Sequence, residues 1–248
     1  MLKPRSLVLR APGSNCDEEA AAAWERAGAS AEIRHVGAVF GSPKMLDDFQ
    51  LLTIPGGFSY GDDLGAGRIL AARLAGALGD ALSRFRDRGG LILGICNGFQ
   101  VLVKAGLLPG GTSSPATVAG NDSGRFEARW VRLLPMPGFS PFVSWDGPIE
   151  LPVAHGEGRY VSADASAGQV VLRYADEHNR ATQAYPANPN GAPDAVAGLC
   201  DATGRVFGLM PHPERFIDGW HHPRWTREGI KAEGDGLRVF RGAVESLR

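Results

Sequence analysis

Gly89-Gly-Leu-Ile-Leu-Gly-Ile-Cys-Asn-Gly98 is the stretch from which the fold class of this chain is inferred. Residues 91–95 form a short apolar run bounded by glycines, a pattern typical of a strand buried on both faces. Residues 98–108 carry apolar side chains at helical spacing and stop at Pro109. The stretch therefore predicts a buried parallel strand that runs directly into a helix.

Cys96 lies at this junction, between small or compact neighbours that leave room for a sharp turn. Such a turn exposes the side chain, and the free amides and dipole at a helix N-terminus favour a thiolate. An isolated cysteine is more often a buried structural residue. The strand-to-helix context is what makes Cys96 the candidate nucleophile.

The same alternation extends along the chain in both directions. Short apolar or β-branched runs predict strands, and alanine-rich or amphipathic segments predict helices between them. The sequence predicts one α/β domain over residues 1–248, with a mostly parallel central sheet flanked by helices and antiparallel strands added in the second half. The strands are expected at 5–11, 30–36, 49–54, 126–134, 149–154, 168–174, 195–200 and 205–210, and further helices at 17–28, 67–88 and 236–247.

Composition excludes several classes of protein. The 248 residues have a formal net charge of −1, so nothing favours nucleic acid or an anionic membrane as a partner. No run approaches the roughly 20 apolar residues that span a bilayer. Three widely spaced cysteines, an odd number, do not suit a disulfide framework and indicate a reducing compartment. The expected location is the cytoplasm.

A second motif, Met210-Pro-His-Pro-Glu-Arg215, supplies a base and an orienting carboxylate. Each proline disfavours helix at the residue before it, which predicts an extended segment. Residues two apart in an extended segment face the same way, so Glu214 is expected beside the imidazole of His212. With Cys96 these two complete a nucleophile, base and orienter set. The alternative is a surface histidine between two prolines.

Acyl transfer also needs donors for a developing oxyanion, and glycines after a strand allow backbone amides to approach a substrate closely. Pro55-Gly56-Gly57 follows an expected strand. The oxyanion hole is therefore assigned to the amides of Gly57 and Asn97, with Phe58 as the substitute for Gly57. The alternative is that this glycine pair is only a turn.

Other motifs are weaker. Ser59 lies in a formal G-x-S-x-G match, but its strand ends before the motif and no helix follows at once, so it is the less favoured nucleophile. The pair His221-His222 lacks partners at metal-ligand spacing and is expected on the surface. No glycine-rich phosphate motif is complete, and no metal is expected in this chain.

Two groups of motifs together resemble a known family. Gly94–Gln100 and Pro211–Glu214 resemble the triad-type (class I) glutamine amidotransferases, which implies a flavodoxin-like sheet. More narrowly, Gly57–Asp62, His155–Arg159 and Asn188–Gly191 resemble the glutaminase subunits of phosphoribosylformylglycinamidine synthase. The resemblance runs through nearly the whole chain in order.

The resemblance implies roles for individual residues. Cys96 attacks the side-chain amide of glutamine, His212 moves protons and Glu214 orients His212. Residues 155–159 are expected beside the glutamine pocket or the ammonia channel, and the alternative is that they form a glycine-rich hairpin between strands. For Gln100 the alternative is a side chain on the helix surface. The substrate-binding residues expected for glutamine are Gln100, Phe58, His155, Gly156 and Glu157.

It also implies partners. A synthetase subunit would bind ATP and Mg²⁺ and use the ammonia to convert formylglycinamide ribonucleotide to formylglycinamidine ribonucleotide. This chain itself would hold no cofactor, and a small third subunit can belong to the complex. Residues 63–67 depart from the family pattern and residues 218–235 look longer than in compact members. Both differences are expected to affect contacts with a partner, and segment 218–235 is a candidate interface element.

Three alternatives stay open at this point. The chain can be an amidotransferase subunit that serves another biosynthetic synthetase, or a cysteine or serine hydrolase of the same architecture. It can also be a non-catalytic binding subunit. Gln100 and the spacing of His212 and Glu214 favour glutamine as the substrate.

Overall fold

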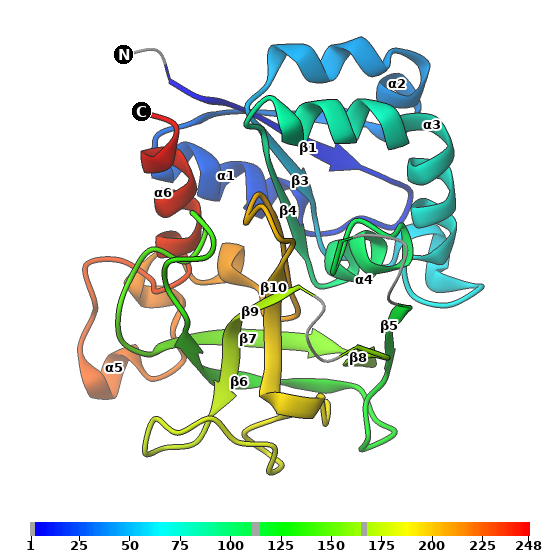
Figure 1. Cartoon of the computed structure of the whole chain (residues 1–248). Coiled ribbons are helices and arrows are strands. Elements are labelled where there is room, and N and C mark those ends of the chain that lie inside the picture. The colour runs from blue at the N-terminus through cyan, green and yellow to red at the C-terminus, as the bar shows by residue number, and fades with distance from the viewer. Residues whose placement is uncertain (1–2, 111–114, 165–167) are drawn as a thin grey trace.

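The computed structural model describes residues 3–110, 115–164 and 168–248. Its centre is a nine-stranded sheet in the order β2-β1-β3-β4-β11-β10-β9-β6-β7, accompanied by a small sheet of β5 and β8 (Figure 1). The strands are β1 (Arg5–Arg10), β2 (Ser30–His35), β3 (Leu51–Ile54), β4 (Leu91–Ile95), β5 (Ala116–Gly120), β6 (Glu127–Pro135), β7 (Ile149–His155), β8 (Glu157–Ser162), β9 (Gln169–Ala175), β10 (Val196–Cys200) and β11 (Val206–Leu209).

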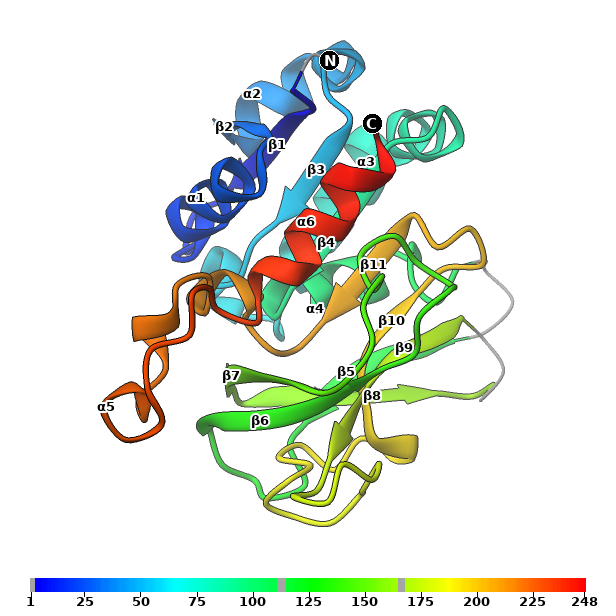
Figure 2. The ribbon, with the colours of Figure 1, turned by 90° about the vertical axis from the view of Figure 1, so that its left-hand side faces the viewer.

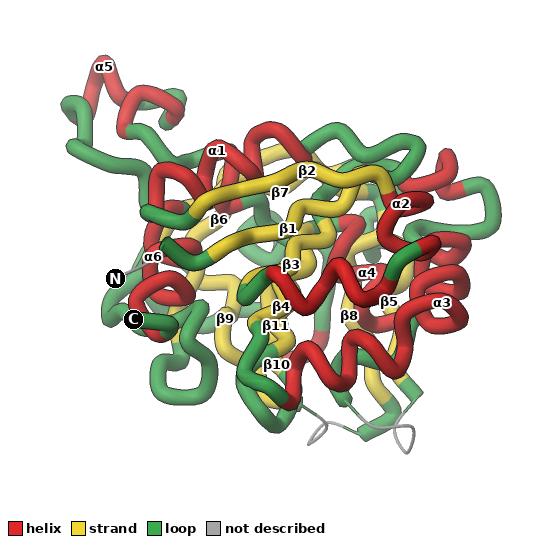
Figure 3. Tube along the Cα trace, turned by 90° about the horizontal axis from the view of Figure 1, so that it is seen from above, coloured by secondary structure: helices red, strands yellow, loops and turns green. Residues whose placement is uncertain are grey.

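Helices cover both faces of the parallel half of the sheet. Figure 3 shows α1 and α6 on one side of the strands and α2, α3 and α4 on the other. The α-helices are α1 (Asp17–Ala27), α2 (Val36–Gly41), α3 (Arg68–Asp87), α4 (Asn97–Lys104), α5 (Trp225–Glu228) and α6 (Leu237–Ser246). Short 3-10 turns occur at Pro43–Asp48, Ser59–Asp62, Pro193–Ala195, Pro213–Arg215 and Gly219–His221. The α5 segment projects from the body of the protein (Figure 2).

The two halves of the sheet differ in strand direction, as the sequence predicts. β2, β1, β3, β4 and β11 pair in parallel. β10, β9, β6 and β7 continue the sheet with antiparallel pairs. The strand order reverses next to β1, so the carboxyl ends of the parallel strands form the edge where open α/β sheets bind ligands.

Among the α-helices and strands, four were not predicted: α2, α5, β5 and β8. The short helix α2 and the strand β5 have small or mixed side chains without a clear period. β8 was considered only as one arm of a hairpin at Gly156, and that alternative is wrong. The chain turns at this glycine, and β8 leaves β7 and pairs with β5 instead.

None of the helices in the described part of the chain combines the length and the apolar character needed to cross a membrane.

The start of α4 packs unusually close to the end of β3. A Cβ atom added at Gly98 would lie 1.8 Å from the carbonyl oxygen of Ile54, well inside any allowed contact. A Cβ added at Gly94, four residues earlier in β4, would lie 2.7 Å from the carbonyl oxygen of Gly98. These glycines let the helix that follows Cys96 sit directly on the sheet, which fixes where that cysteine lies.

We expect Gly98→Ala to lower the free energy of unfolding by about 2–3 kcal/mol, because the added methyl group forces α4 away from β3. Gly76→Ala is the matched control: it lies within α3 and an added Cβ meets nothing within 4 Å. This control should be stabilised by about 0.5–1 kcal/mol through helix propensity. Urea unfolding measures both, and equal stabilities would contradict the close packing at Gly98.

Candidate active site

Cys96 occupies a strained turn between β4 and α4. Its φ of 51° and ψ of −104° lie in a region that residues with a side chain rarely adopt. Such backbone costs of order 1–3 kcal/mol and persists only where the surroundings impose it. Its amide donates to the carbonyl oxygen of Leu209 at 2.8 Å, and its carbonyl accepts the first helical bond from Gln100 at 3.1 Å. The turn has the geometry of a nucleophile elbow.

His212 and Glu214 form the base and orienter pair that the sequence predicts, with a different local structure. Nδ1 of His212 lies 2.6 Å from a carboxylate oxygen of Glu214, and both residues are almost fully buried. Pro213–Arg215 is a 3-10 turn, so the expectation of an extended segment is wrong at Glu214. The turn, not strand alternation, brings the carboxylate back to the ring. The amide of His212 is held by the carbonyl oxygen of Pro152 at 2.8 Å.

The pair prepares the other ring nitrogen for proton transfer. A carboxylate only accepts hydrogen bonds, so Nδ1 of His212 carries a hydrogen and donates it to Glu214. Nε2 is buried and has no hydrogen-bond partner among the described residues. Burial disfavours the charged ring, but the negative charges of Glu214 and then of Cys96 more than offset it and hold the pKa of His212 well above its ordinary value. A charged imidazole beside Cys96 carries a proton on Nε2 that a leaving nitrogen can take up.

The two backbone amides assigned to the oxyanion hole have no hydrogen-bond partner among the described residues. Gly57 has a φ of 137°, and no hydrogen bond to its amide is formed within residues 3–110 or the other described ranges. Asn97 is the first residue of α4, where amides have no acceptor one turn back. The amide of Phe58, the substitute considered for Gly57, donates to the carbonyl oxygen of Gly13 at 2.9 Å. Phe58 is therefore not available as an oxyanion donor, and Gly57 and Asn97 remain the predicted pair.

The side chain of Asn97 ties the nucleophile turn to the loop after β3. Its Oδ1 accepts from the amide of Ser59 at 3.1 Å, and its Nδ2 donates to Asp62 at 3.2 Å and to Gln100 at 2.9 Å. The hydroxyl of Ser59 is buried and has no partner in the described chain, so no base activates it. The G-x-S-x-G match is thus a structural loop and not a second nucleophile.

The end of β7 and the start of β8 form a wall beside Cys96. Sγ of Cys96 lies 3.6 Å from the carbonyl oxygen of Ala154. Nε2 of Gln100 donates to the carbonyl oxygen of Glu157 at 2.5 Å, so Gln100 is buried and not on the helix surface. His155 is 3% exposed. The structure thus brings together the nucleophile and three of the residues expected near the substrate, while the Phe58 ring is exposed on the neighbouring loop.

Cys16 is a neighbour of the base that the sequence analysis did not assign. Its Sγ lies 3.9 Å from Nδ1 of His212 and accepts from the Arg215 guanidinium at 2.9 Å. Burial raises the pKa of Cys16, so it stays a thiol. Cys16, His212 and Glu214 offer ligand atoms within 4.8 Å of one another. The positive charge of Arg215 at the sulfur opposes a cation there, and we assign the set to holding the imidazole in place.

Gly56 explains why the loop after β3 begins with a glycine pair. A Cβ at this position would lie 2.8 Å from Cε1 of His212 and 3.2 Å from Sγ of Cys16. The only sequence feature that could have indicated a role for Cys16 near the site is its position in the turn after the first strand. Its contact with His212 depends on tertiary packing across 196 residues, which no local pattern reveals.

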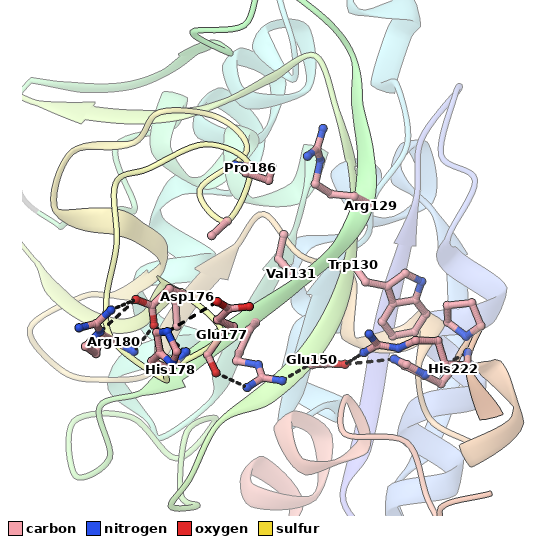
Figure 4. Close-up of a pocket in the computed structure, with 15 residues that line it drawn as sticks. Arg129, Trp130, Val131, Glu150, Asp176, Glu177, His178, Arg180, Pro186 and His222 are labelled. Carbon is pink, nitrogen blue, oxygen red and sulfur yellow. Dashed lines mark hydrogen bonds and ion pairs between the residues drawn. The ribbon is translucent and has the colours of Figure 1, made fainter. Parts of the chain in front are cut away.

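A separate hollow of about 830 Å³ lies over the antiparallel strands (Figure 4). Glu150 connects three of its residues, with oxygens 2.9 Å from Arg132, 3.0 Å from Arg224 and 3.1 Å from His222. His222 is buried against Trp130, so the expectation that it lies on the surface is wrong. The hollow includes none of the candidate catalytic residues.

Comparisons with known proteins agree with this geometry. Residues 3–246 match the family model described as a CobB/CobQ-like glutamine amidotransferase domain. The chain is 48% identical over 254 residues to the phosphoribosylformylglycinamidine synthase subunit PurQ of Dehalococcoides mccartyi, covering 100% of this chain and 99% of that protein. It is 38% identical over 250 residues to the protein of the same name from Thermotoga maritima, covering 100% of both.

Solved structures give the same result. A chain of the structure described as PurLQS from Thermotoga maritima superposes with a TM-score of 0.78 at 35% identity and covers 100% of both chains. A structure described as a glutamine amidotransferase, also from Thermotoga maritima, has a TM-score of 0.56 at 17% identity, covering 100% of this chain and 99% of that one. The second likeness concerns the fold alone.

We expect Glu214→Gln to lower the pKa of His212. The carboxylate is the largest of the contributions that favour the charged ring, and without its charge the effect of burial, which lowers the pKa, is less fully offset. The imidazole should then be neutral at pH values where it is charged in the original protein. An NMR titration of the His212 ring measures this, and an unchanged pKa would show that Glu214 does not control the charge of the base.

Proposed function

This chain belongs to the CobB/CobQ-like glutamine amidotransferase domain family, and we propose that it is the glutaminase subunit of phosphoribosylformylglycinamidine synthase. One observation carries the reaction: Cys96 lies in an elbow at the N-terminus of α4, and the buried His212–Glu214 pair interacts with it electrostatically. The synthase follows from the full-length relatives of that name.

The geometry defines the steps of glutamine hydrolysis. The Cys96 thiolate attacks the side-chain amide carbon of glutamine, and the amides of Gly57 and Asn97 stabilise the oxyanion. His212 donates its Nε2 proton to the amide nitrogen, the C–N bond breaks and ammonia leaves. The resulting glutamyl thioester is hydrolysed by a water molecule that passes a proton to His212. Glu214 keeps the ring oriented through both steps.

Residues around the elbow are proposed to hold glutamine. Gln100 is supported by its place one helical turn beyond Cys96, and its amide is fixed by Asn97 and Glu157. The backbone of residues 155–157 borders the nucleophile through Ala154. Phe58 presents an exposed ring from the oxyanion loop. These contacts complete the proposed substrate site.

The partner is a synthetase subunit, and a small third subunit joins the complex, as the PurLQS structure supports. We assign ATP and Mg²⁺ to the synthetase, because the sequence of this chain has no complete phosphate-binding motif. The chain supplies ammonia in the cytoplasm, which three unpaired cysteines support. Segment 218–235 is proposed as an interface element because it exposes Trp220, Trp225 and Ile230.

The direct test is release of glutamate from glutamine by the purified chain, alone and with the synthetase, formylglycinamide ribonucleotide and ATP-Mg²⁺. We expect release to rise when the complex forms. No release in either state would contradict the glutaminase function and favour a different hydrolase or a binding subunit.

We expect Cys96→Ala to lower glutamine-dependent synthesis in the assembled enzyme by at least about 10³-fold, because no other residue in the elbow can form the thioester. Synthesis from added ammonium should be retained, since it does not pass through Cys96. The two rates are measured on one preparation of the complex. Loss of the ammonium-driven rate as well would show that Cys96 is needed for assembly and not only for hydrolysis.

A further inference from the structure

His155 lies beside the catalytic groups, at the point where β7 ends. The preceding residue, Ala154, places its carbonyl oxygen 3.6 Å from Sγ of Cys96. Two residues before that, the carbonyl oxygen of Pro152 holds the amide of His212. The ring of His155 is itself close enough to His212 for the two to interact electrostatically. No step of the hydrolysis described above uses this imidazole.

The hydrogen-bond network around Asn121 fixes the tautomer of His155. Nδ2 of Asn121 donates to the carbonyl oxygens of Arg125 and His155, each at 2.8 Å, so the amide orientation is determined. Its Oδ1 therefore faces Nδ1 of His155 at 3.0 Å. An amide oxygen only accepts, and Nδ1 must carry the hydrogen. Nε2 of His155 is left with a bare lone pair.

That lone pair has no partner among the described residues, although His155 is 3% exposed. A buried acceptor without a donor is costly, and native structures rarely keep one without a reason. Protonation does not relieve it at neutral pH, because burial and then the charge of His212 lower the pKa of His155 to about 4. The ring sits tightly against Gly158, where an added Cβ would lie 2.5 Å from Nδ1. The acceptor is therefore fixed in place and neutral.

We propose that Nε2 of His155 accepts a hydrogen bond from the ammonia that leaves Cys96-bound glutamine, and so holds it at the exit of the catalytic site. The inference rests on the proposed glutaminase function. When the C–N bond breaks, the Nε2 proton of His212 passes to the leaving nitrogen, which becomes neutral ammonia. Ammonia then donates one N–H to His155, and no proton is transferred in that contact.

A bare imidazole nitrogen suits this task better than most side chains. Ammonia is a nucleophile for the synthetase only while it is unprotonated. An acidic side chain or a charged imidazole could return a proton to it, whereas His155 holds its only ring hydrogen on Nδ1, turned toward Asn121. The contact retains ammonia without converting it to ammonium.

The test compares two variants in the assembled complex with glutamine, formylglycinamide ribonucleotide and ATP-Mg²⁺. The measured quantity is the number of amidine products formed for each glutamate released. His155→Asn keeps an amide near the position of Nδ1 but has no atom near that of Nε2. The ratio of amidine product to glutamate should then fall about tenfold, the factor that corresponds to the free energy of one hydrogen bond. His155→Gln reaches the Nε2 position with an acceptor and should restore most of the ratio. The rate of synthesis from added ammonium is measured on each preparation, so that the results can be corrected for differences in the amount of active synthetase.

A ratio in His155→Asn equal to that of the original complex, however far both rates fall, would overturn the proposal, as would equal losses in both variants. If the unaltered complex releases no glutamate, the proposed function itself fails. A second measurement does not depend on hydrolysis or on folding of a variant. Nitrogen-15 NMR of the original chain at neutral pH should show a hydrogen on Nδ1 of His155 and none on Nε2, and a protonated Nε2 would refute the assignment.

Discussion

The left-handed backbone at Cys96 is the constraint on which the rest of the site depends. It turns the chain from β4 into α4, so that Cys96 lies at the carboxyl edge of the sheet and at the N-terminus of the helix. Close packing of Gly98 on Ile54 and the bonds of the Asn97 side chain keep the turn in place. The strain is thus held by contacts on both sides of the turn.

Much of this arrangement could be predicted because local patterns carry it. The apolar run of β4, the glycines around Cys96 and the prolines around His212 each define a short segment. The contact between His212 and Glu214 was predicted for an incomplete reason, since a 3-10 turn and not strand alternation produces it. A motif of six residues with two prolines and two charged side chains is compatible with both conformations. In the structure the amide of His212 is held by β7, and the turn follows directly after it.

The parts that could not be predicted are those that depend on distant segments. Cys16 reaches the base only because the loop after β1 and the loop after β11 meet at one edge of the sheet. β5 and β8 were missed because their pairing is defined by each other and not by a pattern within either strand. The buried position of His222 depends on Trp130 and Glu150 from two other strands. The reactive groups could be identified from sequence spacing, whereas the residues that surround them depend on tertiary packing.

The position of β7 has a consequence for how the protein gains activity as it folds. β7 is the last strand in the order of the large sheet, yet its end touches Cys96 and anchors the backbone of His212. The elbow lies in the parallel half of the sheet, whereas the backbone amide of His212 finds its acceptor, the carbonyl oxygen of Pro152, in the antiparallel half. Contacts that join residues so far apart in the chain form late and raise the contact order. Glutamine hydrolysis by this chain therefore depends on both halves of the sheet, because the nucleophile and one anchor of its base come from different halves.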